Sequence, residues 1–181
     1  MVRKDYSIIT SCYKENLNLL KEYINHLIYI IKSSKLYKGE IILILESDEF
    51  KKKEKLEYEF YGSENLKILI NKYDKGFSSC LNYGISCSES EYIVRIDPDD
   101  RFSDKKIDYQ IQKMQENFSD ISYTNICINN KKIINYPKNY KELFIKLSYG
   151  FNPVAHPTVI FKRNLFGIDP IYNNKYKYAE D

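Results

Sequence analysis

The chain has 181 residues, of which 43% are hydrophobic, and its 28 basic and 25 acidic side chains leave a formal charge of +3. This length suits one domain with a sizeable core, and so even a charge balance does not favour nucleic acid or a membrane surface as a partner. The four cysteines lack metal-binding spacing and the two histidines lie far from them, so we expect no zinc site and reduced thiols.

In chain order, the first part of the sequence alternates between strand and helix patterns. Residues 6–12 are β-branched and residues 41–45 are continuously apolar, and both runs are typical of buried strands. Between them, apolar residues recur at helical spacing after Asn16, a residue that can cap a helix. The same patterns predict further strands at 66–70 and 91–96, and further helices at 52–61, at 77–86 and from a cap at Asp104 to about residue 118.

The pattern changes after residue 120. Residues 121–128 and 132–135 are predicted strands joined by a hairpin turn at Asn129-Asn130. Residues 139–149 are a predicted helix and residues 156–162 a predicted strand, whereas residues 172–181 fit no element. The alternation of strands and helices predicts an α/β fold with a mostly parallel sheet flanked by helices.

The strongest chemical signal is the sequence Asp97-Pro98-Asp99-Asp100, which directly follows a predicted strand. Ligands of open α/β sheets bind at the carboxyl ends of strands, and clustered carboxylates repel one another unless a cation lies among them. Mg²⁺ and Mn²⁺ take oxygen ligands and bridge to phosphate oxygens, so the motif predicts a metal–diphosphate site. A plain turn is the alternative, because Pro and Asp are common turn residues.

The chain resembles family 2 glycosyltransferases, which have the GT-A fold. The resemblance rests on six segments in the family's order, from the first strand with its Tyr13-Lys14-Glu15 loop, through the Asp-x-Asp motif, to a terminal Glu-Asp pair. These segments are residues 7–15, 40–46, 75–93, 97–100, 156–163 and 179–181. The resemblance implies a single domain over residues 1–181, with a nucleotide-binding part at 1–100 and the start of an acceptor-side part, truncated at its C-terminus, at 101–181.

Roles for the donor side follow from this resemblance. Tyr13 would lie against the nucleotide base, and Glu46 would take the place of the family's aspartate that contacts base or ribose. Asp97 would bind ribose or metal-linked water, Asp99 would coordinate Mn²⁺ or Mg²⁺, and Asp100 would support the cluster. In the family such an ion stabilises the charge that develops on the departing diphosphate.

Three further candidates for the site are Asp181, the pair Lys75-Gly76 and His156. Asp181 would be the base that deprotonates the acceptor hydroxyl; because it is the last residue of the sequence, we expect weak or absent transfer by this chain. The pair Lys75-Gly76 fits either a phosphate contact or a plain turn. His156 fits either a contact to diphosphate or acceptor, or a structural position before Pro157.

The function expected from the resemblance is inverting transfer of a sugar from a nucleotide-diphosphate donor, expected to be a UDP-sugar, to a hydroxyl of a surface glycan or lipid-linked acceptor. We expect a cytoplasmic protein that can associate with the inner face of the membrane through a missing C-terminal region. A sugar nucleotidyltransferase is one alternative, although the loop after the first strand lacks the glycines that such enzymes use for phosphate. A non-catalytic nucleotide-sugar-binding domain is the other.

Overall fold

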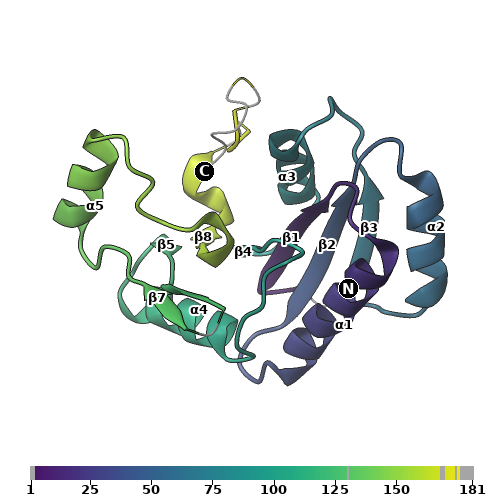
Figure 1. The fold of residues 1–181 in the computed structure, drawn as a ribbon. Coiled ribbons are helices and arrows are strands. Elements are labelled where there is room, and N and C mark those ends of the chain that lie inside the picture. Colours follow the sequence, from purple (N-terminus) through teal and green to yellow (C-terminus); the bar gives the residue numbers. More distant parts are fainter. Residues whose placement is uncertain (1–2, 130, 168–169, 174, 176–181) are drawn as a thin grey trace.

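The computed structural model describes residues 3–129, 131–167, 170–173 and 175, and a six-stranded sheet lies at its centre (Figure 1). The strands of this sheet are β1 (Tyr6–Cys12), β2 (Gly39–Leu45), β3 (Leu66–Ile70), β4 (Tyr92–Arg95), β5 (Ile121–Ser122) and β8 (Ile160–Lys162). Their order is β3-β2-β1-β4-β8-β5. Strands β1 to β4 are parallel, whereas β8 pairs antiparallel with both β4 and β5. The predicted α/β fold with a mostly parallel sheet is therefore confirmed.

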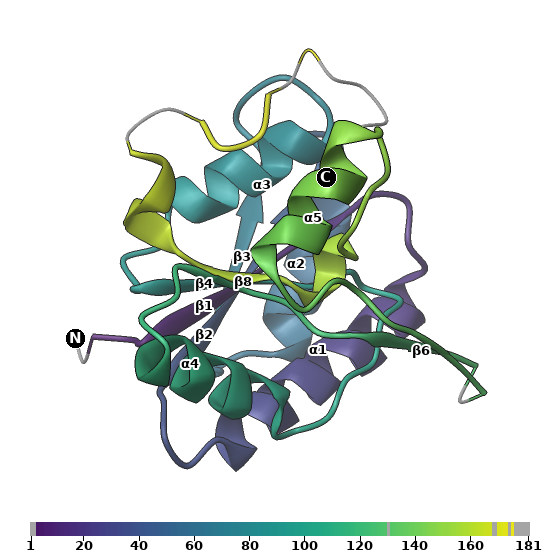
Figure 2. The ribbon, with the colours of Figure 1, turned by 90° about the vertical axis from the view of Figure 1, so that its left-hand side faces the viewer.

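Helices cover both faces of the sheet. They are α1 (Leu17–Ser33), α2 (Phe50–Glu59), α3 (Phe77–Ser86) and α4 (Lys106–Glu116). One apolar core joins α1, α2 and α4 to one face, and a second core joins α3 to the other. Figure 2 shows this arrangement, with α3 above the strands and α1 and α4 below them.

The packing of these layers follows from local sequence. All seven residues of β2 are buried, as expected for a strand between two helical layers. Asn16 caps α1 as predicted, because its Oδ1 accepts a hydrogen bond from the backbone N of Asn18 at 2.8 Å. Helix α3 lies so close to β2 that a Cβ at Gly84 would be 2.5 Å from Cδ1 of Ile44. This close contact fixes the position of α3 on the sheet.

The segment after β5 is built differently. It forms the hairpin of β6 (Ile126–Ile128) and β7 (Lys132–Ile134), and then α5 (Tyr140–Ser148). Figure 1 shows α5 at the opposite side of the molecule from β2 and β3. Asn139 caps α5, since its Oδ1 accepts a hydrogen bond from the backbone N of Glu142 at 3.0 Å. No residue of α5 is buried.

Three predictions about elements need correction. Helix α4 begins at Lys106 without a side-chain cap from Asp104; instead Oγ of Ser103 accepts a hydrogen bond from the backbone N of Lys105 at 3.3 Å. The predicted strand at 121–128 is split between β5 in the main sheet and β6 in the hairpin. The predicted strand at 156–162 begins as a 3₁₀ turn, η1 (His156–Thr158), because Pro157 cannot donate to a sheet ladder.

Among the helices of the described residues, none is long and apolar enough to cross a membrane.

Candidate functional site

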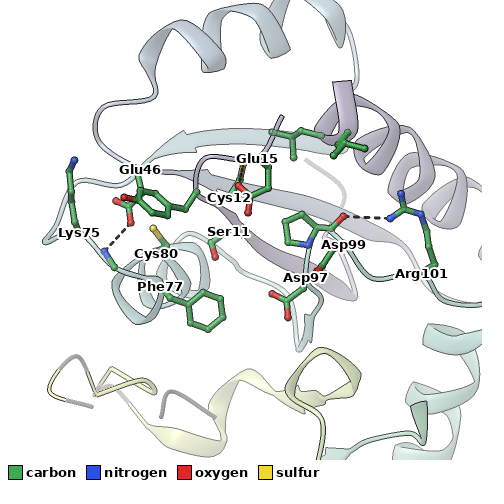
Figure 3. A pocket seen from close by; sticks show the side chains of 15 residues that line it. Ser11, Cys12, Glu15, Glu46, Lys75, Phe77, Cys80, Asp97, Asp99 and Arg101 are labelled. Atoms are coloured by element: carbon green, nitrogen blue, oxygen red, sulfur yellow. Dashed lines mark hydrogen bonds between the residues drawn. The ribbon is translucent and has the colours of Figure 1, made fainter. Parts of the chain in front are cut away.

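A pocket of about 850 Å³ lies at the carboxyl ends of β1, β2 and β4, shown in Figure 3. Strand β1 lies between β2 and β4, so the order of the strands reverses at β1. Open α/β sheets bind their ligands at such a reversal, outside the carboxyl ends of the strands. The lining residues come from the end of β1 and the loop after it, from α1, from the loops after β2 and β4, and from the loop before α3 with the first turn of that helix: Ser11, Cys12, Tyr13, Glu15, Leu19, Leu20, Glu46, Lys75, Gly76, Phe77, Cys80, Asp97, Pro98, Asp99 and Arg101.

Glu46 follows β2 and is 4% exposed. Its Oε1 accepts a hydrogen bond from the backbone N of Gly76 at 2.9 Å, at the first turn of α3, where the helix dipole stabilises a negative charge. Gly76 has φ 139°, a conformation that other residues rarely adopt. Within the described residues, Oε2 of Glu46 is buried and has no hydrogen-bond partner. A buried acceptor without a partner costs free energy, so a ligand N–H or O–H that reached Oε2 would bind strongly.

Asp97 and Asp99 reach the pocket through a tight turn. The turn runs from Asp97 to Asp100 and is closed by the backbone N of Asp100, which donates to the carbonyl O of Asp97 at 3.2 Å. Pro98 takes the second position, which its fixed φ favours. Asp100 does not line the pocket. Burial, and then the charges of Asp97 and Asp99, raise the pKa of the Asp100 carboxyl. The turn predicted as an alternative is thus present, and it brings two carboxylates to the pocket.

The side chain of Arg95 forms an ion pair with Asp97 at the wall of the pocket. This last residue of β4 is 1% exposed, and its Nη2 donates to Oδ1 of Asp97. The Arg95 guanidinium carbon also lies 4.6 Å from the ring centre of Phe77, which lines the pocket. A buried guanidinium requires a compensating negative charge. Arg95 and Asp97 therefore fix each other at the pocket wall.

Two cations stand on opposite sides of the pocket (Figure 3). On one side, Nζ of Lys75 lies 2.7 Å from Oδ2 of Asp48, and this hydrogen bond raises the pKa of the Lys75 ammonium. On the other side, Nη1 of Arg101 donates to the carbonyl O of Asp100 at 3.0 Å. The lining thus combines ammonium and guanidinium groups with carboxylates, a composition that suits a phosphate ligand accompanied by a metal ion.

The two cysteines of the pocket are poor nucleophiles. Burial, and then the charge of the neighbouring Glu46, raise the pKa of Cys80 to about 12. Burial likewise raises the pKa of Cys12, whose thiol donates to Oε2 of Glu15 at 2.8 Å. Since the thiolate is the reactive form of cysteine, neither side chain is suited to covalent catalysis.

A clamp beside the pocket fixes the segment around Tyr172. Asn82 of α3 donates from Nδ2 to the carbonyl O of Tyr172 at 2.7 Å and accepts from its backbone N at 3.0 Å. The Tyr172 hydroxyl lies 2.8 Å from Nε2 of His156. The His156 ring packs edge-to-face on Phe77, with ring centres 6.0 Å apart. His156 therefore does not line the pocket itself but packs against Phe77, which does.

Comparison with known proteins places this geometry in a family. The model of the family described as "Glycosyl transferase family 2" matches residues 7–171. The chain belongs to glycosyltransferase family 2. The bifunctional glycosyltransferase pgtA of Dictyostelium discoideum is 31% identical over an alignment 180 positions long, which covers 78% of this chain and 23% of that protein. An uncharacterized glycosyltransferase of Haemophilus influenzae is 26% identical over 65% of this chain and 41% of its own length.

Similarity to solved glycosyltransferase structures confirms the GT-A fold of this chain. The S. aureus TarS fragment 1-349, in complex with UDP-GlcNAc, has a TM-score of 0.69 at 16% identity and covers 98% of this chain. The mannosyltransferase PcManGT from Pyrobaculum calidifontis, in complex with GDP-Man and Mn²⁺, has a TM-score of 0.60 at 16% identity and covers 88%. The chain spans 51% and 45% of those two structures, and less than half of the two curated relatives.

The structure brings most of the site residues expected from the family together. Tyr13, Glu46, Lys75, Asp97 and Asp99 all line the same pocket, although their roles stay predictions. Tyr13 is 53% exposed on the loop after β1.

The structure places the remaining candidates elsewhere. His156 lies behind Phe77, outside the lining, and Asp181 lies outside the described residues. Sequence reasoning missed Arg95 and the Asn82 clamp. An arginine in an otherwise apolar strand could have indicated a buried ion pair at Arg95. The partner of Asn82 is 90 residues away, and no local sequence pattern indicates this contact.

Proposed function

We propose that this family 2 glycosyltransferase binds a nucleotide-diphosphate sugar, preferably a UDP-sugar, in the pocket at the ends of β1, β2 and β4. The observation that carries the proposal is the buried, unpartnered Oε2 of Glu46 on one side of the pocket, opposite the Asp97–Asp99 turn. Glu46 would accept a hydrogen bond from the base or ribose, and Tyr13 would pack against the base. The similar TarS and PcManGT structures, which hold UDP-GlcNAc and GDP-Man, support a donor of this class.

The residues present fit a divalent ion that arrives with the diphosphate. Among the described residues, no group of three His, Cys, Asp or Glu side chains is placed to hold a metal. Mg²⁺, however, is commonly held by one or two carboxylates and completed by substrate phosphates and water. Asp97 and Asp99 supply two carboxylates, with Asp99 the more exposed. When bound, such an ion neutralises charge on the leaving diphosphate, and the Mn²⁺ in the PcManGT complex supports this assignment.

The transfer that we propose is inverting. The acceptor hydroxyl oxygen forms a bond to the anomeric carbon while the bond from that carbon to the diphosphate breaks on the opposite face. Asp181 would receive the hydroxyl proton, and the transition state would resemble an oxocarbenium ion. Lys75 would contact the donor on the Glu46 side of the pocket. The acceptor that we propose is a hydroxyl of a surface glycan or a lipid-linked sugar.

The test is a titration of the chain with UDP, GDP and dTDP sugars, with and without Mn²⁺, followed by thermal unfolding. A ligand that binds only the folded chain raises the melting temperature. We expect a Mn²⁺-dependent increase for a UDP-sugar, and a loss of about tenfold or more in affinity for Glu46→Gln and for Asp99→Asn.

The matched control is Glu116→Gln on α4, far from the pocket, which should leave the affinity unchanged. Equal affinity in Glu46→Gln and the unchanged chain would place the nucleoside elsewhere and overturn the proposal. Release of free sugar or transfer to an added acceptor would then separate an enzyme from a non-catalytic binding domain.

A further inference from the structure

The segment of residues 121–152 exposes an unusual number of large apolar side chains. On α5, Tyr140 is 74% exposed, Phe144 56% and Leu147 56%. With the intermediate Leu143 they occupy positions i, i+3, i+4 and i+7, which is one continuous face of a helix. A helix of a single globular domain normally buries such a face. Outside α5, the same segment exposes Ile128, Ile133, Tyr149 and Phe151.

The same segment holds a concentrated positive charge. Residues 121–152 contain five lysines and one glutamate, all exposed, whereas the rest of the chain holds one acidic side chain more than basic ones. The lysines are Lys131, Lys132, Lys138, Lys141 and Lys146. The near-neutral total charge therefore conceals one strongly basic region, and this region coincides with the exposed apolar face.

We propose that α5 and the adjoining β6–β7 hairpin form a docking surface for a lipid bilayer that contains anionic lipids. An apolar helix face flanked by lysines, here Lys141 and Lys146, fits the boundary between headgroups and acyl chains, where lysine stems lie along apolar surface and the ammonium groups reach lipid phosphates. This inference rests on the exposed surface alone and does not depend on the donor site.

Other occupants fit this surface less well. A second copy of the chain would bring five lysines against five, which is electrostatically unfavourable. The core of a protein interface is depleted of lysine. Nucleic acid would use the lysines and stack on the aromatic rings, but it offers little to the aliphatic Ile133, Ile145 and Leu147, which are all exposed.

The experiment is co-sedimentation of the 181-residue chain with vesicles of phosphatidylcholine, alone or mixed in equal parts with phosphatidylglycerol. We expect sedimentation with the mixed vesicles only, decreasing as salt is added. Lys138→Gln and Lys141→Gln should each weaken partitioning about fivefold, because each lysine near an anionic surface contributes about that factor. Phe144→Ser should weaken it about tenfold through lost apolar burial.

Matched controls lie on α2. Tyr58→Ser and Lys51→Gln alter side chains that are also exposed but lie outside the surface, so they should sediment like the unchanged chain. All variants change exposed positions, and unaltered circular dichroism would show that each is folded.

Four results would overturn the proposal: no binding to mixed vesicles by the folded chain, equal binding to neutral vesicles, equal losses in the α2 controls, or binding to a polynucleotide but to no vesicle. A dimer that Phe144→Ser abolishes, without vesicle binding, would identify a second copy as the occupant. Donor affinity should be the same in Phe144→Ser and the unchanged chain, so failure here is distinguishable from failure of the donor site.

Discussion

Strand β2 and helix α5 represent two opposite ways of using apolar residues. Every residue of β2 is buried between two helical layers, whereas α5 buries none of its nine. The region around β2 completes its own core and shapes a pocket at its edge. The region around α5 has the composition of a core without the layers to cover it. Apolar content alone therefore does not show whether a segment stabilises the fold or is available to a partner.

The largest expected effect contrasts one apolar side chain from each region. Ile42→Ala removes a fully buried side chain of β2, and we expect a loss of about 3–4 kcal/mol in the free energy of unfolding. Phe144→Ala on α5 should change it by less than about 0.5 kcal/mol. Urea unfolding of the two variants measures both. A large loss for Phe144→Ala would show that α5 is packed against the rest of the chain, and the contrast would disappear.

The two regions also differ in the exposure of their lysine side chains. Lys141 on α5 is exposed, whereas Nζ of Lys106 on α4 is buried and has no hydrogen-bond partner within the described residues. The ammonium lies 5.2 Å from the ring centre of Phe102. Burial lowers the pKa of Lys106 to about 8, and the charge of Asp100 only partly opposes this.

The second prediction uses this buried ammonium. Between about pH 8 and the ordinary lysine pKa of 10.5, the unfolded chain binds more protons at this site than the folded chain, so stability increases with pH there. Lys106→Met should therefore stabilise the fold by about 2–3 kcal/mol near neutral pH, and the gain should disappear as the pH approaches 10.5. Urea unfolding over that pH range, with Lys141→Met as the exposed control, tests this. A gain that does not change with pH would contradict the buried charge.

The smallest expected effect compares two helix caps of the same chemistry. Asn16 caps α1, a helix that packs on the core, and Asn139 caps α5, a helix with no buried residue. Asn16→Ala should lower global stability by about 1 kcal/mol. Asn139→Ala should leave global unfolding unchanged and accelerate hydrogen exchange only in α5, because that helix opens locally. Equal global losses for both variants would show that α5 unfolds together with the sheet.

The core of the fold was predictable because its signals are local. Continuous apolar runs identified β1 to β4 to within a few residues, and the position of Asp97 and Asp99 after β4 predicted their place at the sheet edge. The short strands β5 and β8 carry too few residues for a pattern, so their antiparallel pairing was not predictable. The bond between Glu46 and Gly76 joins residues 30 apart and depends on the assembled sheet.

One inference from composition needs refinement. An overall charge of +3 does not favour a membrane surface as a partner, yet five lysines and one glutamate occupy residues 121–152. Averages over the whole chain remove this asymmetry, whereas the charge of a single folded surface determines what it attracts. The local charge of each segment was readable from the sequence; its coincidence with an uncovered helix face was not.

The clamp from Asn82 to Tyr172 has a consequence for sequence divergence. Asn82 holds both main-chain groups of residue 172, much as a neighbouring strand would, so the path of the chain there is independent of the side chain at that position. The bond from the Tyr172 hydroxyl to His156, by contrast, requires tyrosine. Position 172 can therefore change its chemistry during evolution while the backbone keeps its course, provided that an amide remains at position 82.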